Sequence, residues 1–329
     1  MAILGHKIDK VVNINQGADD IRISSLILLQ AEARQPGTET EVEKQYVIGG
    51  IRLCVLSEMQ LENRGWSGLF ETDGREGRGF QIKVKTGKLP LYPGASELYS
   101  GPKRRTVTVG DKLVSYYREP NRTWQFCYEE EERRGRLTVV PEVAHYAYDI
   151  RNIWDKIDFS RILLKNSALI LHASYIIWNG RGILFTAPSG TGKSTQAELW
   201  KKYRGARIIN GDRAVIREKD GQLWTYSLPF AGSSGICLNK DAPLAAIAVL
   251  EQAGEDEVHR MSGINSVKHL YTQCAVNRWN AEEVSAVTRL LENMSGEAEI
   301  VKLRCRPCES AVDILETYLK KRKKEKKTV

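Results

Sequence analysis

The chain of 329 residues is longer than one compact domain usually is, so its length favours two domains. Its 42% hydrophobic and 27% charged residues are ordinary for a soluble globular protein, and no run of 18 apolar residues predicts a membrane-spanning helix. The net charge of +8 argues little for nucleic-acid binding, because the stretch KKRKKEKK at residues 320–327 alone holds seven of the basic residues. We therefore expect a basic tail at residues 321–329 and no nucleic-acid partner.

The N-terminus and the cysteines both favour a cytoplasmic protein. The opening MAILGHKIDKVVNINQ lacks the basic start, apolar stretch and cleavage site of a secretory signal. The six cysteines lie mostly in apolar, strand-like surroundings of a long chain, as buried reduced thiols do. Cys305 and Cys308, in CRPC, have the spacing of a redox or metal-ligand pair, but no second pair or close His accompanies them. We interpret them as two structural thiols.

Short runs of alternating or β-branched residues, separated by Gly, Pro, Asp and Asn, make the first 140 residues β-rich. The Gly-Asp turn in TVGDKLVSYY predicts a β-meander, and the acidic EEEERR at 129–134 is typical of an exposed strand end and turn. We expect residues 1–150 to form a β-rich accessory domain, whose position suits the presentation of a substrate. The runs lie at residues 46–57, 79–86, 105–110, 112–119, 123–130 and 136–141.

After Pro141 the strands are followed by helices, which predicts an α/β second domain over residues 151–320. The apolar spacing of residues 149–166 predicts a helix that bridges the two halves. Strands are expected at residues 168–178, 183–186, 206–211, 213–218, 223–228, 245–252 and 298–304, and helices at residues 193–203, 264–275, 281–294 and 310–324.

The stretch GILFTAPSGTGKST contains the strongest motif of the chain, a glycine loop between a strand and a helix. Residues 187–194 fit the P-loop pattern except that Ala187 replaces its first glycine. The glycines let backbone N–H groups turn toward nucleotide phosphates at the positive end of the helix dipole. Lys193 supplies a charge to the phosphates, and the Ser194 hydroxyl supplies a ligand for Mg²⁺. The expected nucleotide-binding residues are Ala187, Pro188, Ser189, Gly190, Thr191, Gly192, Lys193, Ser194 and Thr195. The alternative is a glycine-rich turn before an ordinary helix.

Asp212 and His172 are the candidates for the chemistry beside this loop. Asp212 follows the apolar run RIING and suits the acid that a P-loop needs for its metal, although Asn-Gly-Asp is also good hairpin chemistry. His172 ends the apolar run ALIL, fifteen residues before Ala187, and taken alone a single His in a strand is more often structural. Arg213 is expected either to pair with Asp212 or to reach a phosphate.

The spacing LHASYIIWNGRGILFTAPSGTGKST…RIINGDRAVI resembles the catalytic domain of HPr kinase/phosphorylase, a family that shares its nucleotide fold with phosphoenolpyruvate carboxykinase. The resemblance covers roughly residues 165–255, and the β-rich first 140 residues do not share it. It implies an α/β P-loop kinase domain with ATP and Mg²⁺ as cofactors. It also implies that His172, Lys193 and Asp212 are catalytic residues and that Ser194 and Asp212 bind the metal.

Two positions depart from the pattern of that family. Gly211 stands where the family has the first of two adjacent aspartates, and Phe230 stands where it has a Glu. Because phosphoryl transfer depends mostly on positioning and charge stabilisation, the loss of one acid is compatible with kinase chemistry. His172 or Asp212 is then the candidate base. Reverse phosphorolysis, which relies on the full acidic set, becomes doubtful.

The leading hypothesis is an ATP-dependent kinase that transfers the γ-phosphoryl group to a serine-type hydroxyl of a peptide or protein. Relatives without the HPr kinase N-terminal domain include kinases that modify precursor peptides of ribosomally made natural products, which makes such a peptide the expected partner. A non-catalytic nucleotide-binding regulatory protein and a small-molecule kinase on the same scaffold are the alternatives. Homo-oligomers are common among the relatives, so the resemblance is compatible with an assembly of several copies.

Overall fold

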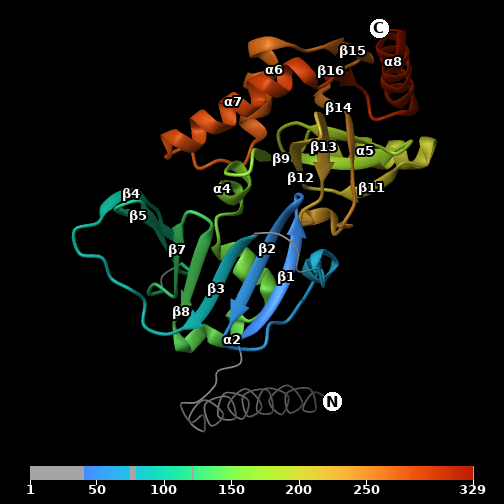
Figure 1. Cartoon of the computed structure of the whole chain (residues 1–329). Helices are drawn as coiled ribbons and strands as arrows, with labels where there is room; N and C mark the ends of the chain where they lie inside the picture. Colours follow the sequence, from blue (N-terminus) through green and yellow to red (C-terminus); the bar gives the residue numbers. More distant parts are fainter. Residues whose placement is uncertain (1–40, 75–78, 121, 329) are drawn as a thin grey trace, which may run out of the picture. The chain divides into compact units, whose positions relative to one another are not determined.

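Two eight-stranded sheets organise the chain, which a computed structural model describes for residues 41–328 except residues 75–78 and 121. Both sheets belong to one structural unit, Glu41–Val329, drawn in colour in Figure 1. The mixed α/β architecture expected from the sequence is confirmed. The opening residues that argued against a secretory signal, and residues 1–40 of the expected β-rich domain, lie outside the described residues. The expected division of the chain near residue 150 stays a prediction.

The first sheet has the strand order β1-β2-β3-β8-β7-β6-β5-β4 and is antiparallel except where β3 pairs with β2 and β8. The predicted meander is present in β5 to β8, with Gly110 (φ 58°) in the expected turn. The run at 46–57 is not one strand, because Gly49 and Gly50 adopt positive φ angles and reverse the chain. The strands are β1 (Val42–Ile48), β2 (Ile51–Ser57), β3 (Phe80–Thr86), β4 (Ser96–Ser100), β5 (Arg104–Val109), β6 (Lys112–Tyr117), β7 (Phe126–Glu131) and β8 (Arg134–Val139), with the 3₁₀ helix η1 (Ser67–Phe70) after β2.

The acidic run at 129–134 is only partly the exposed strand end that we expected. Glu129 and Glu130 of β7 are 6% and 2% exposed. Glu130 accepts hydrogen bonds from Arg161 Nε at 3.0 Å and from Lys165 Nζ at 2.6 Å. A buried carboxylate requires such partners, and both come from residues that are distant in the sequence, so the local pattern did not reveal them.

The second sheet runs in the order β10-β9-β12-β13-β14-β16-β15, with β11 also paired to β9 and β10 also paired to β14. The predicted helix at 149–166 is two helices, because Ile157 is extended (φ −93°, ψ 156°) and ends the first, and Asp158 caps the second through the Arg161 amide. The strands are β9 (Ala168–Trp178), β10 (Arg181–Thr186), β11 (Arg207–Asn210), β12 (Arg213–Lys219), β13 (Gln222–Tyr226), β14 (Asp241–Gln252), β15 (Glu257–Arg260) and β16 (Ile300–Cys305). The helices are η2 (Pro141–Val143), α2 (Ala144–Ala147), α3 (Ile150–Lys156), α4 (Phe159–Leu164), α5 (Lys193–Arg204), η3 (Gly232–Ser234), α6 (Gly263–Gln273), α7 (Ala281–Glu297) and α8 (Glu309–Thr328).

Helix α8 extends through the predicted basic tail to Thr328. Within the part of the chain that the structure describes, no helix is both long and apolar enough to cross a membrane. The strand β15 and the edge strand β4 had no counterpart in the sequence prediction.

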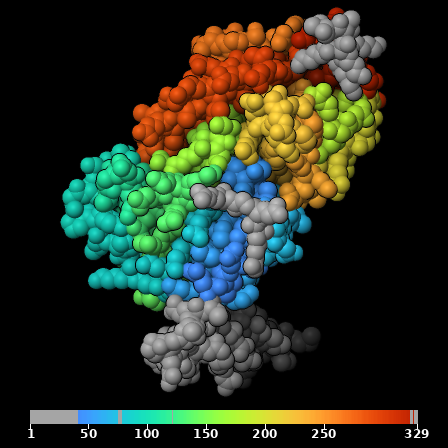
Figure 2. All heavy atoms as spheres, viewed as in Figure 1, coloured from blue at the N-terminus to red at the C-terminus, as the bar shows by residue number. Residues whose placement is uncertain are grey.

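Side chains that alternate along the strands divide the second sheet into two apolar faces. On β9, Leu171 and Tyr175 join the core formed with α6 and α7, whereas Ile176 joins the core formed with α5 and α8. Figure 2 shows the orange-red surface of α7 against the yellow-green surface of α4, and the two helices are in contact. The sheet is therefore buried on both faces, which suits its parallel pairs β10/β14 and β14/β16.

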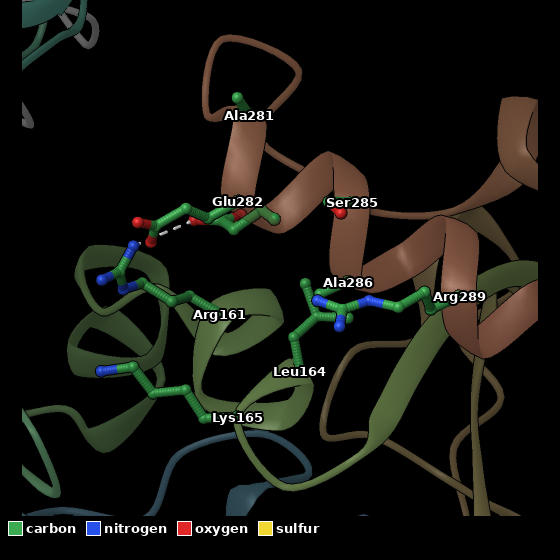
Figure 3. Close-up of a pocket in the computed structure, with 9 residues that line it drawn as sticks. Arg161, Leu164, Lys165, Ala281, Glu282, Ser285, Ala286 and Arg289 are labelled. Atoms are coloured by element: carbon green, nitrogen blue, oxygen red, sulfur yellow. Dashed lines mark hydrogen bonds and ion pairs between the residues drawn. The ribbon is translucent and has the colours of Figure 1, made fainter.

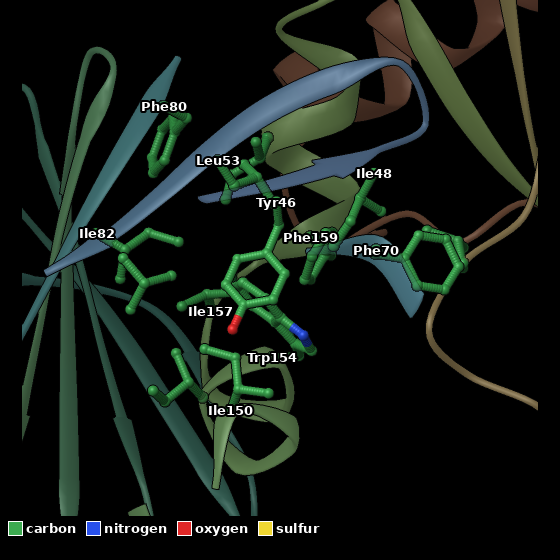
Figure 4. Packing of buried hydrophobic residues seen from close by; sticks show 14 of the residues in the cluster. Tyr46, Ile48, Leu53, Phe70, Phe80, Ile82, Ile150, Trp154, Ile157 and Phe159 are labelled. Carbon is green, nitrogen blue, oxygen red and sulfur yellow. The ribbon is translucent and has the colours of Figure 1, made fainter. Parts of the chain in front are cut away.

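Aromatic residues connect the first sheet to the segments that follow it. Trp154 of α3 packs edge-on against Tyr46 of β1, with ring centroids 5.1 Å apart, and against Phe159 of α4 at 5.3 Å (Figure 4). Phe159 in turn packs edge-on against Phe230, which follows β13, at 5.9 Å. The core of the first sheet thus continues to the residues that lie beyond β13 of the second sheet.

A buried ionic group at Asp158 connects β5 of the first sheet to the junction of α3 and α4 and to the segment between α6 and α7. Asp158 accepts from Arg104 Nη2 of β5 at 3.0 Å and from Asn277 Nδ2 at 2.7 Å, and its side chain is 5% exposed. Burial alone would raise the pKa of Asp158, but Arg104 and these hydrogen bonds outweigh burial and hold the pKa below its ordinary value.

We expect Asp158→Asn to lower the free energy of unfolding at pH 7 by about 3 kcal/mol, because Arg104 loses its buried partner. The stabilisation by this carboxylate is lost as the pH falls through its depressed folded-state pKa, so the difference from the unaltered chain should narrow below about pH 4. Urea unfolding at several pH values measures both effects, with Asp111→Asn at an exposed turn as the control. A difference that does not change with pH would contradict this account.

Candidate functional site

The long strand β9 brings the predicted site residues to one edge of the second sheet. On one side it pairs with β10, so that Ala173 lies opposite Thr186, the last residue before the glycine loop. On the other side it pairs with β12, so that His172 lies opposite Arg213. Thr186 Oγ1 also donates to the carbonyl of His172 at 2.8 Å. The loop, His172 and Asp212 are therefore neighbours, although they come from three separate segments.

The glycine loop connects β10 to α5 in the arrangement that the motif predicts. Gly190 and Gly192 have φ angles of 80° and 111°, which side chains disfavour, and Gly192 precedes the first residue of α5. Among the described residues, no acceptor bonds to a backbone N–H of Gly190, Gly192, Lys193, Ser194 or Thr195. These are the free N–H groups of a helix start, where the helix dipole also favours an anion.

Lys193 folds back over the loop that it follows. Its Nζ donates to the carbonyl oxygens of Ala187 at 2.9 Å and Pro188 at 3.2 Å, and the residue is 8% exposed. Burial lowers the pKa of Lys193, and the nearby Asp212 partly opposes that effect. The ammonium group is thus held close to the free N–H groups, while Ser194 and Thr195 are exposed at the helix start.

His172, Asp212 and Arg213 form a group of charged and polar side chains beside the loop. His172 Nε2 lies 3.5 Å from Asp212 Oδ1, and Arg213 Nε lies 3.1 Å from Asp212 Oδ2. Burial and the charge of Lys193 lower the pKa of His172 below its ordinary 6.5, although Asp212 acts in the opposite direction. The lowered pKa favours the neutral imidazole, which is the form able to accept a proton.

The segment around Asp212 is not the hairpin that Asn-Gly-Asp suggested as an alternative. β11 and β12 both pair antiparallel with β9, so the chain continues in one direction past a short interruption at Gly211 and Asp212. Ala173 N donates to the carbonyl of Asp212 at 3.0 Å and fixes that interruption to β9. Asp212 thus projects from a break in a strand.

Asn210 is a site residue that the sequence analysis missed. It is fully buried, and its Oδ1 accepts from the amides of Asp212 and Arg213, both at 3.0 Å. A polar amide that ends a buried apolar strand just before Gly-Asp was the available signal. The sequence analysis treated it as ordinary turn chemistry.

Gly211 and Phe230, the two positions that depart from the HPr kinase/phosphorylase pattern, are both closely packed against other residues. A Cβ built on Gly211 would lie 2.5 Å from Ser234 Cβ and closer still to its Oγ, so Ser234 fills the space beside Gly211. The ring of Phe230 contacts Phe159, and the guanidinium carbon of Arg213 lies 5.8 Å from the centre of that ring. Arg213 hence pairs with Asp212 and with Phe230.

The donor set near the loop suits Mg²⁺ bound together with phosphate. Mg²⁺ prefers oxygen ligands and commonly uses one or two protein side chains plus substrate phosphates. The exposed Ser194 hydroxyl and the Asp212 carboxylate, whose side chain is 25% exposed, supply such oxygens. The described residues contain no cluster of three or more His, Cys, Asp or Glu side chains that would hold a metal by themselves, and the CRPC pair has no additional ligands.

A separate open cavity of about 600 Å³ lies between α4 and α7 (Figure 3). Its lining includes Arg161 and Lys165, which are paired with the buried Glu130 and, for Arg161, with Glu283. None of the predicted site residues lines this cavity. Since Arg161 and Lys165 already have acidic partners, we assign this cavity no role in the site.

Comparison with known proteins places the chain in a family. The sequence profile described as "SynChlorMet cassette protein ScmC" matches residues 151–315, just over half of the 329 residues. The chain belongs to this family. The ScmC match contains His172, the whole glycine loop and Asp212.

The comparisons with curated proteins and with solved structures are less informative about this chain than the ScmC match. No curated protein matches the chain. Among solved structures, the Hpr(Ser) kinase/phosphatase from Coxiella burnetii is similar at 11% sequence identity and a TM-score of 0.28, over 48% of this chain and 98% of that chain. A likeness at this TM-score supports no conclusion about the function of this ScmC-family chain.

Because Ser234 fills the space beside Gly211, we expect Gly211→Ala to destabilise the chain by about 1–3 kcal/mol through overpacking. Gly254→Ala is the matched control, since a Cβ on Gly254 would meet no atom within 4 Å. The double variant Gly211→Ala with Ser234→Gly should recover most of the loss. Thermal unfolding of the unaltered chain, the two single variants and the double variant measures these stabilities. Equal stability of Gly211→Ala and Gly254→Ala would show that the segment around Ser234 accommodates the added Cβ without loss of stability.

Proposed function

We propose that this ScmC-family chain is an ATP-dependent kinase that transfers the γ-phosphoryl group to a serine-type hydroxyl of a peptide or protein. The observation that carries the proposal is the run of free N–H groups at the start of α5, with Lys193 beside it and Asp212 and His172 at the same sheet edge. A ligand with several anionic oxygens, such as a triphosphate, suits this combination.

Different groups of the chain would bind the phosphates and the Mg²⁺ ion. The N–H groups of Gly190, Gly192 and the first turn of α5 would bind the β- and γ-phosphate oxygens. Lys193 Nζ would exchange its bonds to two neutral carbonyls for a charged phosphate, which is the stronger acceptor. Ser194 and Asp212 would hold Mg²⁺, which when bound neutralises charge on the transferring phosphoryl group.

His172 is the group that suits the acceptor proton. In the transfer, the acceptor oxygen forms a bond to the γ-phosphorus, the bond to the ADP oxygen breaks, and the acceptor proton moves to the unprotonated ring nitrogen of His172. The lowered pKa of His172 favours the neutral imidazole, which has such a nitrogen, and Asp212, 3.5 Å from Nε2, stabilises the imidazolium that results. The exposed Arg213 guanidinium supplies further positive charge beside Asp212.

The acceptor class is inferred from the family description and from the motifs. The ScmC family is described as a cassette protein, which supports a search for the acceptor among the peptides and proteins of the same cassette. The motifs also resemble kinases that modify precursor peptides. A serine-type hydroxyl on such a peptide is therefore the acceptor that we propose.

One observation favours a second candidate, a nucleotide-binding regulatory protein without transfer activity. Ser234 occupies the space of a side chain at Gly211, so the site offers one carboxylate where the HPr kinase/phosphorylase pattern has two. Binding of ATP without transfer to any acceptor would support this candidate over the kinase.

We expect Lys193→Ala to weaken ATP binding by about 10–100-fold, since a charged hydrogen bond to phosphate contributes roughly 1.5–3 kcal/mol. Isothermal titration with ATP measures the affinity. Lys201→Ala, an exposed lysine on the same helix, is the matched control and should bind as the unaltered chain does. Equal ATP affinity of Lys193→Ala and Lys201→Ala would contradict the proposal that the glycine loop binds phosphate.

With γ-labelled ATP, Mg²⁺ and cassette-encoded peptides, we expect one added phosphate on a peptide hydroxyl, read by mass spectrometry. The same product should be absent with Lys193→Ala and present with Lys201→Ala. Phosphate on a small molecule would replace the peptide acceptor, and tight ATP binding with no phosphorylated product would favour the regulatory protein.

A further inference from the structure

We propose that Asn210 is a positioning residue that holds the Asp212 carboxylate in place for Mg²⁺ by tying the strand break at Gly211–Asp212 to the segment after β13. The inference rests on the proposed function, because it assigns a role within the same site. Asn210 itself is fully buried and acts only through the residues that it bonds.

The acceptor side of the Asn210 carboxamide determines the path of the strand break. Its single oxygen receives the N–H groups of both Asp212 and Arg213, at 3.0 Å each, and so uses its two lone pairs. These two amides belong to the residues that form the ion pair at the site. The direction in which the Asp212 side chain leaves the backbone therefore depends on this oxygen.

The donor side of the same carboxamide reaches the segment after β13. Nδ2 donates to the carbonyl of Leu228 at 3.0 Å, the carbonyl of Phe230 at 2.8 Å and the hydroxyl of Ser227 at 3.2 Å. Phe230 is packed against Phe159 and thereby against the core of the first sheet. One side chain thus connects the backbone of Asp212 to a segment that is itself fixed in the core.

The chemistry of this position requires an amide. An Asp would place carboxylate oxygens against three acceptors, and an aliphatic residue would leave two amides and two carbonyls without their buried partner. The neighbouring Gly211 lacks a side chain, so it adds conformational freedom that the bonds of Asn210 must restrain. Without Asn210, the break between β11 and β12 loses the contacts that orient it.

The glycine loop does not share this dependence. Lys193 is held by the carbonyls of Ala187 and Pro188, and among the described residues Asn210 bonds to no residue of the loop. Loss of Asn210 should hence disturb the Asp212 carboxylate, which would bind the metal, and leave the glycine loop and Lys193, which would bind the phosphates, unchanged. This separation distinguishes a positioning role from a general loss of folding.

The test is ATP binding by isothermal titration, with EDTA and with saturating Mg²⁺, in the full chain. For the unaltered chain we expect Mg²⁺ to raise ATP affinity. For Asn210→Ala we expect the affinity in EDTA to stay within about twofold and the Mg²⁺-dependent gain to fall about 10–100-fold or to vanish, as for other residues that orient a metal ligand. The matched control is Asn239→Ala, an exposed asparagine that bonds to the carbonyl of Leu69.

A double-mutant cycle identifies the residue through which Asn210 acts. If Asn210 acts through Asp212, Asp212→Asn alone lowers the Mg²⁺-dependent gain, and adding Asn210→Ala lowers what remains by less than it lowers the gain of the unaltered chain. Additive losses would overturn the inference. If Asn210→Ala does not fold, Asn210→Ser provides the comparison, because its hydroxyl can accept from one of the two amides without placing a charge against the acceptors; it should retain part of the gain, and an undiminished gain would overturn the inference.

The outcomes separate the two proposals. A folded Asn210→Ala chain with an undiminished Mg²⁺-dependent gain would overturn the role of Asn210 and leave the kinase proposal intact. An equal loss of affinity with and without Mg²⁺ would show that Asn210 supports the fold only, which also overturns it. Failure of the unaltered chain to bind ATP at all would overturn the proposed function, and this inference with it.

Discussion

The pairing of β9 along both of its edges is the constraint on which the candidate site depends. On one side, β10 ends at Thr186 and is followed by the glycine loop. On the other side, β12 begins at Arg213, directly after Asp212. His172 lies between them on β9 itself. A slip of one residue in either register would reverse the faces to which the side chains point and separate the three groups. The apolar residues of β9, buried in cores on both faces, make such a slip costly.

The first sheet contributes to this edge through the residues that follow β13. Leu228, Ala231 and Cys237 are buried in the same core as Tyr46 of the first sheet and Phe70 of η1, so the segment that covers Gly211 is anchored there. The charged group at Asp158 adds a polar connection from the first sheet to the junction of α3 and α4, with Arg104 on β5 as its partner. A β-rich part that merely presented a substrate would not need this packing. We infer that the first sheet also supports the segment that lies beside Gly211 and Asp212.

The sequence allowed the strands and the order of the motifs to be predicted, because those depend on local patterns. Residues 168–178 have an apolar, β-branched pattern and form β9 with the predicted bounds. The loop and Asp212 are candidates from residue type and spacing, whereas His172 is a candidate only through the resemblance to HPr kinase/phosphorylase. The partners of Glu130 and the contacts of Asn210 depend on segments far away in the chain, so no local pattern contained them. The break between α3 and α4 was hidden for the opposite reason, since the apolar spacing continues through Asp158 while its side chain caps a new helix.

The position of Gly211 bears on which of the two proposed functions the site suits. An acid there would need a Cβ in the space that Ser234 occupies, so a single substitution does not convert this site into one with two carboxylates. A nucleotide-binding protein without transfer would still use Asp212 for Mg²⁺, but it would have no need for a proton acceptor placed beside that acid. Yet the backbone of Asp212 is held by Asn210 Oδ1 and by Ala173 N, and its carboxylate contacts both His172 and Arg213. The hydrogen bonds to the Asp212 backbone thus hold the one remaining carboxylate beside His172, and this arrangement supports the kinase proposal.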